Sequence, residues 1–333
     1  MMKKIILFTA ALILATAYAH AATTIKIATL SPDGSMWMEK MRKGADAVAQ
    51  KTEHRVEIRF YTGGVMGDDK SVIRKIHIGQ LHGGAVISGS MTQFYPDNQI
   101  YAMPLKFRSL EEVDYIRKNM DKFIAEGLEK SGFMTFGLAE GGFAYLMSKE
   151  PVKNIEELRK RKVWIPDDDS AIFEAVKAFG INPIPLSIAD VRAGLQTGLI
   201  DTVATSPVGA IALQWHTQVK YLLDMPFLYL YALLAVDKKA YQKLSPGDQK
   251  ILSEEMGRAF SEIGAENRKD DEKASEALKK QGIQFLTPTP DDMKEWLKIS
   301  ETVPDRLIKS GKLSPDILKT FEGHLNDFRA KAK

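Results

Sequence analysis

The amino-acid sequence predicts an α/β protein with two lobes and one long helix that lies across both of them. Strand and helix patterns alternate in two separate runs, over residues 24–88 and 135–204. Such alternation is typical of parallel sheets with helices on their faces. A third run, residues 246–282, is helical almost throughout. A helix of about 35 residues extends about 50 Å, which is longer than one small lobe.

The first run predicts three strands and two helices. Residues 24–30 and 55–61 alternate apolar and polar side chains, which is the period of a half-buried strand. Apolar side chains recur at helical spacing over residues 36–52 and again over residues 68–78. A short apolar strand over residues 83–88 completes the unit. In parallel sheets of this kind, ligands bind at the carboxyl ends of the strands.

The second run repeats the same order of elements. Its predicted strands are residues 135–139, 162–165, 182–186 and 200–204, and its predicted helices are residues 155–159, 170–179 and 189–197. We interpret the two α/β units as two lobes with a cleft between them. Amphipathic helices are predicted from Pro290 onward.

The first residues predict an export signal. Lys3 and Lys4 precede an apolar run over residues 5–17, and Ala19 and Ala21 supply the small side chains of an A-x-A cleavage site. The apolar run is shorter than the roughly 20 residues that cross a bilayer, so we favour a cleaved signal over a retained membrane anchor. We expect cleavage after Ala21 and a mature protein outside the cytoplasmic membrane.

The composition narrows the range of partners. The chain has no cysteine, which excludes a lipid tether on cysteine, disulfide bonds and thiolate metal sites. Removal of the two signal lysines lowers the formal net charge from +3 to +1. Such a balanced charge gives no reason to expect nucleic acid or an anionic membrane surface as a partner.

No motif for catalysis or metal binding stands out in the sequence. The histidines form neither an H-E-x-x-H motif nor an i,i+4 pair, so we predict no metal and no other cofactor. Three acids, residues 167–169, follow the predicted strand at 162–165. Acids are typical of a helix N-terminus. The functional alternative is that one of the three points into the cleft and binds a ligand or a cation.

Four segments together carry a family signature: residues 182–201 (NPIPLSIADVRAGLQTGLID), 65–69 (VMGDD), 104–107 (PLKF) and 162–166 (KVWIP). In motif order and spacing, over essentially the whole mature chain, the sequence resembles the DctP-type periplasmic solute-binding receptors of TRAP transporters. The resemblance implies a periplasmic binding protein fold. In this fold, crossing strands join the two lobes and a long helix spans both.

The resemblance also implies lobe boundaries and a function. Lobe I is expected to comprise residues 22–141 and 232–271, and lobe II residues 142–231 and 272–333. The family implies a cleft that closes on a small solute, usually an organic acid. It also implies delivery of the solute to a membrane permease driven by an ion gradient. We therefore expect a monomeric periplasmic receptor and not an enzyme.

One departure from the family pattern bears on the ligand. The family arginine that pairs with the solute carboxylate is replaced by Trp164, and a second family arginine falls on Ala144. An apolar or aromatic ligand could stack on Trp164. A cation could be held by a cation–π contact together with Asp168 or Asp169. A carboxylate could instead be held elsewhere, for example by Arg192.

Ten residues make up the predicted ligand site. Trp164 and Phe107 are expected to form an apolar wall, and the remaining members are Asp69, Ser88, Ser90, Glu140, Asp169, Thr205, Ser206 and Trp215. Two other functions compete with transport. One is a secreted hydrolase or lyase that acts through Glu140 and Asp169, and the other is a ligand-loaded partner of a membrane sensor.

Overall fold

The computed structural model describes residues 22–331, and the predicted export signal, residues 1–21, lies outside them. The first predicted α/β unit is present. Strands β1 (Thr23–Thr29), β2 (Val56–Tyr61) and β3 (Gly83–Ile87) pair in parallel in the order β3-β1-β2, and helices α2 (Met36–Lys51) and α3 (Asp69–His77) connect them. Both helices start at a residue whose side chain accepts a backbone hydrogen bond, Ser35 and Asp68 respectively.

The second unit is also present. Strand β6 (Trp164–Pro166) pairs in parallel with β7 (Ile184–Leu186), and a bridge between Val163 and Thr202 leads to β8 (Thr202–Thr205). Strands β9 (Tyr221–Leu223) and β11 (Gln284–Leu286) pair in parallel beyond them. The helices of this unit are α5 (Ile155–Arg159), α6 (Ser170–Ala178), α7 (Val191–Thr197) and α8 (Pro207–Ala212).

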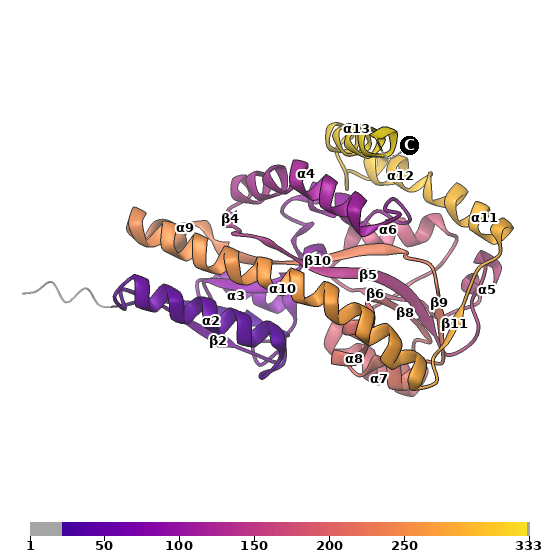
Figure 1. Ribbon diagram of the computed structural model, residues 1–333, viewed down its shortest axis with the longest axis horizontal. Helices are drawn as coiled ribbons and strands as arrows, with labels where there is room; N and C mark the ends of the chain where they lie inside the picture. Colours follow the sequence, from indigo (N-terminus) through magenta and orange to yellow (C-terminus); the bar gives the residue numbers. More distant parts are fainter. Residues whose placement is uncertain (1–21, 332–333) are drawn as a thin grey trace, which may run out of the picture.

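Two long strands cross from one lobe to the other, as the family resemblance implied. Strand β5 (Leu138–Ser148) pairs with β10 (Leu228–Asp237) through its first half and with β8 and β9 through its last residues. On its other edge, β10 pairs with β3. The resulting sheet has the order β11-β9-β5-β10-β3-β1-β2, so both lobes share one continuous sheet (Figure 1). The predicted strand over residues 135–139 is replaced by two strands, because β4 (Phe133–Met134) ends before β5 begins.

The long helix predicted over residues 246–282 is helix α10 (Pro246–Lys280) of 35 residues. It contacts α2 at one end, β5 in the middle and α8 further along, and it therefore spans both lobes (Figure 1). Two of its glycines lie where it meets β5 and the residues just before that strand. A Cβ on Gly257 would lie 2.7 Å from the Phe136 carbonyl oxygen, and one on Gly264 would lie 3.1 Å from the Glu140 nitrogen. The absence of side chains here lets the helix lie close against β5.

The C-terminal helices contact both predicted lobes. They are α11 (Pro290–Ser300), α12 (Val303–Lys309) and α13 (Pro315–Lys331). Helix α12 packs against α6, whereas α13 packs against α4 (Leu110–Lys130), a helix of the predicted lobe I. The boundary that assigns residues 272–333 to lobe II therefore remains a prediction. Among the helices of residues 22–331, none is both long enough and apolar enough to cross a membrane.

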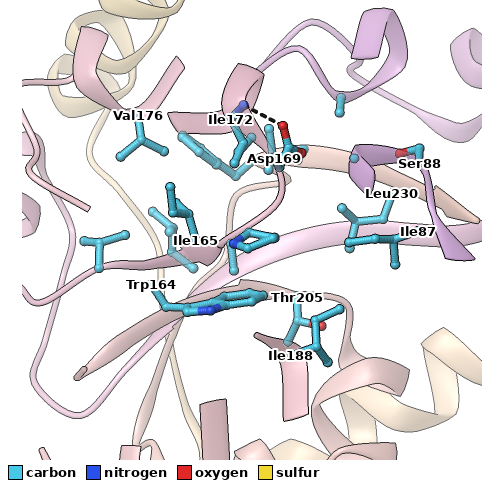
Figure 2. A pocket seen from close by; sticks show the side chains of 18 of the residues that line it. Ile87, Ser88, Trp164, Ile165, Asp169, Ile172, Val176, Ile188, Thr205 and Leu230 are labelled. Carbon is cyan, nitrogen blue, oxygen red and sulfur yellow. Dashed lines mark hydrogen bonds between the residues drawn. The ribbon is translucent and has the colours of Figure 1, made fainter. Parts of the chain in front are cut away.

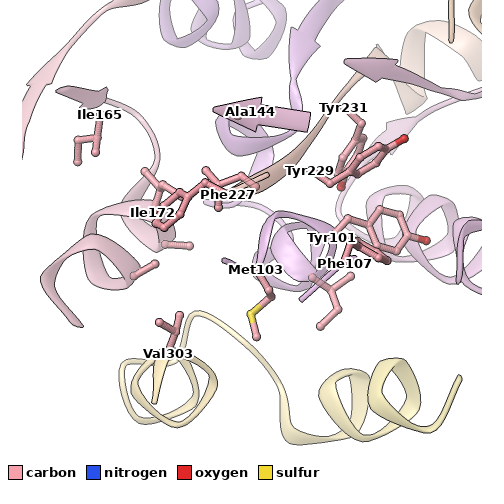
Figure 3. Packing of buried hydrophobic residues seen from close by; sticks show 14 of the residues in the cluster. Tyr101, Met103, Phe107, Ala144, Ile165, Ile172, Phe227, Tyr229, Tyr231 and Val303 are labelled. Atoms are coloured by element: carbon pink, nitrogen blue, oxygen red, sulfur yellow. The ribbon is translucent and has the colours of Figure 1, made fainter. Parts of the chain in front are cut away.

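The largest apolar core runs between these layers. It contains Tyr101 and Met103, which lie in and just after the 3₁₀ helix η2 (Pro96–Ala102), together with Phe107 and Tyr229. Figure 3 shows these side chains with Val303 of α12 on the far side of Met103. Phe107 makes edge-to-face contacts with Tyr229 and with Phe321 of α13, at centroid distances of 5.8 and 5.5 Å. This core thereby fixes the C-terminal helices to the crossing strands.

Candidate ligand-binding site

A cavity of about 190 Å³ lies between the two lobes. The first lobe contributes Ile87 from the end of β3, Ser88 and Gly89 from the 3₁₀ helix η1 (Ser88–Met91), and Gln99 and Ala102 from η2. The second lobe contributes Trp164, Ile165, Pro166, Asp169, Ile172, Val176, Ile188, Thr205 and Trp215, among others. The crossing strands add Leu146, Leu228, Leu230 and Tyr231. Five of the ten predicted site residues line this cavity, namely Ser88, Trp164, Asp169, Thr205 and Trp215.

Trp164 forms one wall of the cavity. It is the first residue of β6, and its indole Nε1 donates a hydrogen bond of 3.0 Å to the Leu186 carbonyl on the neighbouring strand β7. Its ring meets that of Trp215 edge to face, at 5.1 Å between centroids and 77° between planes. Figure 2 shows the flat indole on one side of the cavity, with Ile172 and Val176 of α6 on the opposite side.

Asp169 lies where the two lobes meet. It caps α6, because its Oδ1 accepts hydrogen bonds from the backbone nitrogens of Ala171 and Ile172 at 3.1 and 2.9 Å, and Figure 2 shows the bond from Ile172. Its Oδ2 accepts a hydrogen bond of 2.6 Å from Gln99 Nε2 in η2. Burial raises the pKa of Asp169 to about 6, although these hydrogen bonds oppose the rise. The contact with Gln99 joins a residue of predicted lobe I to one of predicted lobe II.

Asp69 and Ser90 lie beside the cavity rather than in it. They line a small recess with Asp68, Asp167 and Asp168, in which acids from both lobes face one another. Asp69 Oδ2 accepts hydrogen bonds from the Ile87 nitrogen at 3.0 Å and from Ser90 Oγ at 3.3 Å. Burial raises the pKa of Asp69 to about 7, and the negative charge of Asp168 raises it further. Burial raises the pKa of Asp168 as well.

The remaining predicted residues lie elsewhere. Phe107 belongs to the core described above and borders a separate surface pocket beside Arg329. Ser206 caps α8 by accepting a hydrogen bond of 3.3 Å from the Gly209 nitrogen. Arg192 is exposed on α7 and is not among the residues that line the cavity.

Glu140 faces a different groove, between α4 and α10. Arg268 Nε donates to its Oε1 at 2.9 Å, and the Tyr229 hydroxyl donates to its Oε2 at 3.2 Å. Asp169 does not line this groove, and Glu140 does not line the cavity between the lobes. The structure therefore does not bring together the two carboxyl groups that the hydrolase hypothesis requires.

Gln99 and Tyr231 are site residues that were not predicted from the sequence. Gln99 lies in a 3₁₀ helix without a periodic apolar pattern, so no local signal marks it. Tyr231 lies on β10, which the strand and helix patterns did not place. Its hydroxyl donates a hydrogen bond of 2.7 Å to Asn98 Oδ1, beside Gln99.

These features define a class of protein. Two α/β lobes that share crossing strands enclose a cavity whose wall comes from both, and within residues 22–331 no group of three or more histidine, aspartate or glutamate side chains is arranged to hold a metal ion. Such a cavity is that of a protein that binds small molecules between its lobes. The sequence matches the family described as bacterial extracellular solute-binding protein, family 7 (DctP), over residues 27–310. The chain belongs to this family.

Individual relatives agree with this assignment. The sialic acid-binding periplasmic protein SiaP of Vibrio cholerae is 21% identical over 290 residues, which cover 85% of this chain and 89% of that protein. A TRAP periplasmic solute binding protein from Haemophilus influenzae with bound L-gulonate superimposes with a TM-score of 0.83 at 17% identity, covering 90% of this chain and 99% of that one. DctP7 of Bordetella pertussis, a receptor binding pyroglutamic acid, superimposes with a TM-score of 0.82 at 20% identity, covering 92% and 100%.

Proposed function

We propose that this protein is the extracytoplasmic solute receptor of a TRAP-type transporter, and that it binds one small organic molecule in the cavity between its lobes. Membership of the solute-binding family supports this function. The observation that carries the proposal is the cavity itself, because both lobes and the crossing strands contribute to its wall. A ligand held there contacts both lobes at once.

Closure of the lobes would be coupled to binding through contacts that form only when the lobes are together. The hydrogen bond between Gln99 and Asp169 is one such contact, and the close approach of Gly89 to Asp169 is another. A ligand that fills the cavity contacts both lobes in the closed state. In an open state it would make fewer contacts. Binding therefore shifts the population toward the closed state.

The relatives indicate a small organic molecule, and the wall of the cavity indicates an apolar part in that molecule. L-gulonate and pyroglutamic acid, the ligands named for two structural relatives, are organic acids. Trp164, Trp215 and the isoleucines of the cavity favour a ligand with an apolar or aromatic body. We propose that the protein acts in the periplasm as a monomer, after removal of residues 1–21, and hands its ligand to membrane permease subunits.

Thermal unfolding with a panel of acidic, aromatic, cationic and neutral metabolites tests the proposal. A ligand present at about 100 times its Kd stabilises the folded protein by about 2.7 kcal/mol, and small-angle scattering should show a more compact protein with the same compound. Gln99→Leu should weaken this effect because it removes the hydrogen bond to Asp169. Gln50→Leu, at an exposed position on α2, is the matched control. If no compound stabilises the protein or compacts it, the receptor function is wrong.

A further inference from the structure

The charges around the cavity are unusual for a site that receives an anion. Of the side chains that line it, only Asp169 carries a charge near neutral pH, and no lysine, arginine or histidine is among them. Burial keeps the tyrosine of the wall, Tyr231, in its neutral form, because its pKa lies well above the ordinary value. A carboxylate ligand would thus be buried near a like charge and without a cation. Burial of an unpaired charge is strongly unfavourable.

The cavity also offers a cationic ligand little access to Asp169, its one acidic side chain. Both oxygens of Asp169 already accept hydrogen bonds, two on Oδ1 and one on Oδ2. Gly89 also covers Oδ2 so closely that a Cβ on Gly89 would lie 2.2 Å from it. Gly89 and Gln99 therefore limit the access of an ammonium group to Oδ2.

Neutral polar groups do remain accessible in the wall. Within residues 22–331, neither the Thr205 hydroxyl nor the Gln99 side-chain carbonyl takes part in a side-chain hydrogen bond, and no fully buried side-chain polar atom lacks a partner. These two groups are therefore not fully buried, and a ligand in the cavity can form a hydrogen bond with each of them. The Trp164 Nε1 group, in contrast, is already bonded to Leu186.

We propose that the cavity selects an electrically neutral ligand: a mainly apolar, ring-sized molecule that carries one or two hydrogen-bonding groups. The volume of about 190 Å³ sets the size, since an apolar cavity of roughly 150 Å³ accommodates benzene. An organic acid enters this cavity only in its protonated form. This inference rests on the proposed receptor function, because it names the class of molecule that the same cavity binds.

Matched sets of probes test the inference at pH 7.5 by calorimetric titration. One set is phenylacetamide, phenylacetate and 2-phenylethylamine, and the corresponding amide, acid and amine of cyclohexylacetic and indole-3-acetic acid form two more. In at least one set, the amide should bind at least tenfold more tightly than the acid and the amine, which is a difference of about 1.4 kcal/mol. Tighter binding of an acid or an amine in any set, or binding of no amide at all, overturns the inference.

Substitution of the buried acid provides the second test. Asp169→Asn removes the negative charge and retains a side chain that caps helices well, so the preference for amide over acid should narrow by about tenfold. Asp237→Asn makes the same chemical change at the residue that caps helix α9 (Lys238–Gln242) and that does not line the cavity, so it should leave the preference unchanged. An Asp169→Asn protein with an unchanged preference contradicts the role assigned to this charge.

The two proposals fail in different ways. Compaction and stabilisation by a charged metabolite, with weak binding of every amide, would leave the receptor function intact and overturn the neutral-ligand inference. The absence of any stabilising compound would overturn the receptor function. Trp164→Arg adds a further readout, because a guanidinium in the wall should reverse the preference toward the acid.

Discussion

Gly89 and Asp169 meet across the boundary between the lobes, at a distance that only glycine permits. Gly89 lies in the 3₁₀ helix that follows β3, and Asp169 caps α6. A Cβ on Gly89 would lie 2.2 Å from Asp169 Oδ2. Because real Cβ atoms do not approach other atoms so closely, either residue would have to move if Gly89 carried a side chain.

Gly89→Ala should therefore disfavour the closed arrangement of the lobes. We expect small-angle scattering to show a larger radius of gyration and the affinity for the best-bound of the three amides to fall by at least about tenfold, or 1.4 kcal/mol. Gly323→Ala is the control, because Gly323 lies in α13 with open space around it. That substitution should stabilise the fold by about 0.5–1 kcal/mol. Wild-type compactness in Gly89→Ala would contradict the prediction.

The acids in the recess beside the cavity predict a pH dependence. The folded protein raises the pKa of Asp69 to about 7, so the folded state holds this proton at pH values where the unfolded chain, with a pKa of about 3.9, has lost it. The contribution of Asp69 to folding stability must then decrease as the pH rises from about 4 to about 7 and level off above. Asp168, whose pKa is also raised, acts in the same direction.

Asp69→Asn should remove the part of this dependence that is due to Asp69. The variant should match the wild type near pH 4.5 and exceed its stability by a few kcal/mol at pH 7.5, because one pKa unit corresponds to about 1.4 kcal/mol. Urea denaturation at both pH values measures the difference, with Asp33→Asn at an exposed position as the control. Equal gains at both pH values would show that the titration of Asp69 is not the cause.

Arg268 should be important for stability and dispensable for ligand selection. It bonds Glu140 and also Asp114, and the Glu140 side chain is only 5% exposed. Arg268→Leu leaves this buried carboxylate without its cation and should lower the free energy of unfolding by about 3 kcal/mol. Lys294→Leu, which breaks an exposed pair with Asp291, should cost less than about 1 kcal/mol in the same denaturation experiment. If Arg268→Leu and Lys294→Leu lower the free energy of unfolding by equal amounts, the prediction is wrong.

Substitutions of Phe107 and of Trp164 should affect different properties, namely the stability of the fold and the affinity for the ligand, respectively. Phe107→Leu loses edge contacts with Tyr229 and Phe321, so we expect a loss of about 1–2 kcal/mol in the free energy of unfolding. Because Phe107 does not line the cavity, the Kd for the best-bound of the three amides should change less than about twofold. Trp164→Phe should instead weaken binding by more than about fivefold. A similar loss of affinity in both variants would show that Phe107 does contribute to ligand binding, and would contradict the prediction.

The spacing of apolar residues predicted the strands and helices that have one buried face and one face that is at least partly exposed. Strand β1 alternates where Ile25 and Ile27 are buried and Lys26 between them is partly exposed, and α2 shows the helical spacing because one of its faces is buried. Strand β5 does not alternate, since it is buried on both faces over most of its length and is interrupted by Gly141 and Gly142. Only the family resemblance predicted crossing strands. Helix α4 was not predicted, although Ser109 caps it.

The site was predictable where a residue follows a strand directly. Asp169 follows the carboxyl end of β6, where ligands bind in parallel sheets, and Trp164 was predicted because it stands at the position of the family arginine. Glu140 and Phe107 occupy other places because their partners, Arg268 and Phe321, come from much later in the chain. Such long-range pairs leave no local pattern.

The interlacing of the two lobes also constrains when the protein can fold. The apolar cluster around Ile25 and Ile27 is completed by Leu234 on β10 and by Phe260 and Ile263 on α10, more than two hundred residues downstream. A nascent chain that emerges from the ribosome in order cannot finish this cluster until most of the polypeptide has been synthesised. The apolar core of the first lobe is therefore incomplete until α10 has been synthesised.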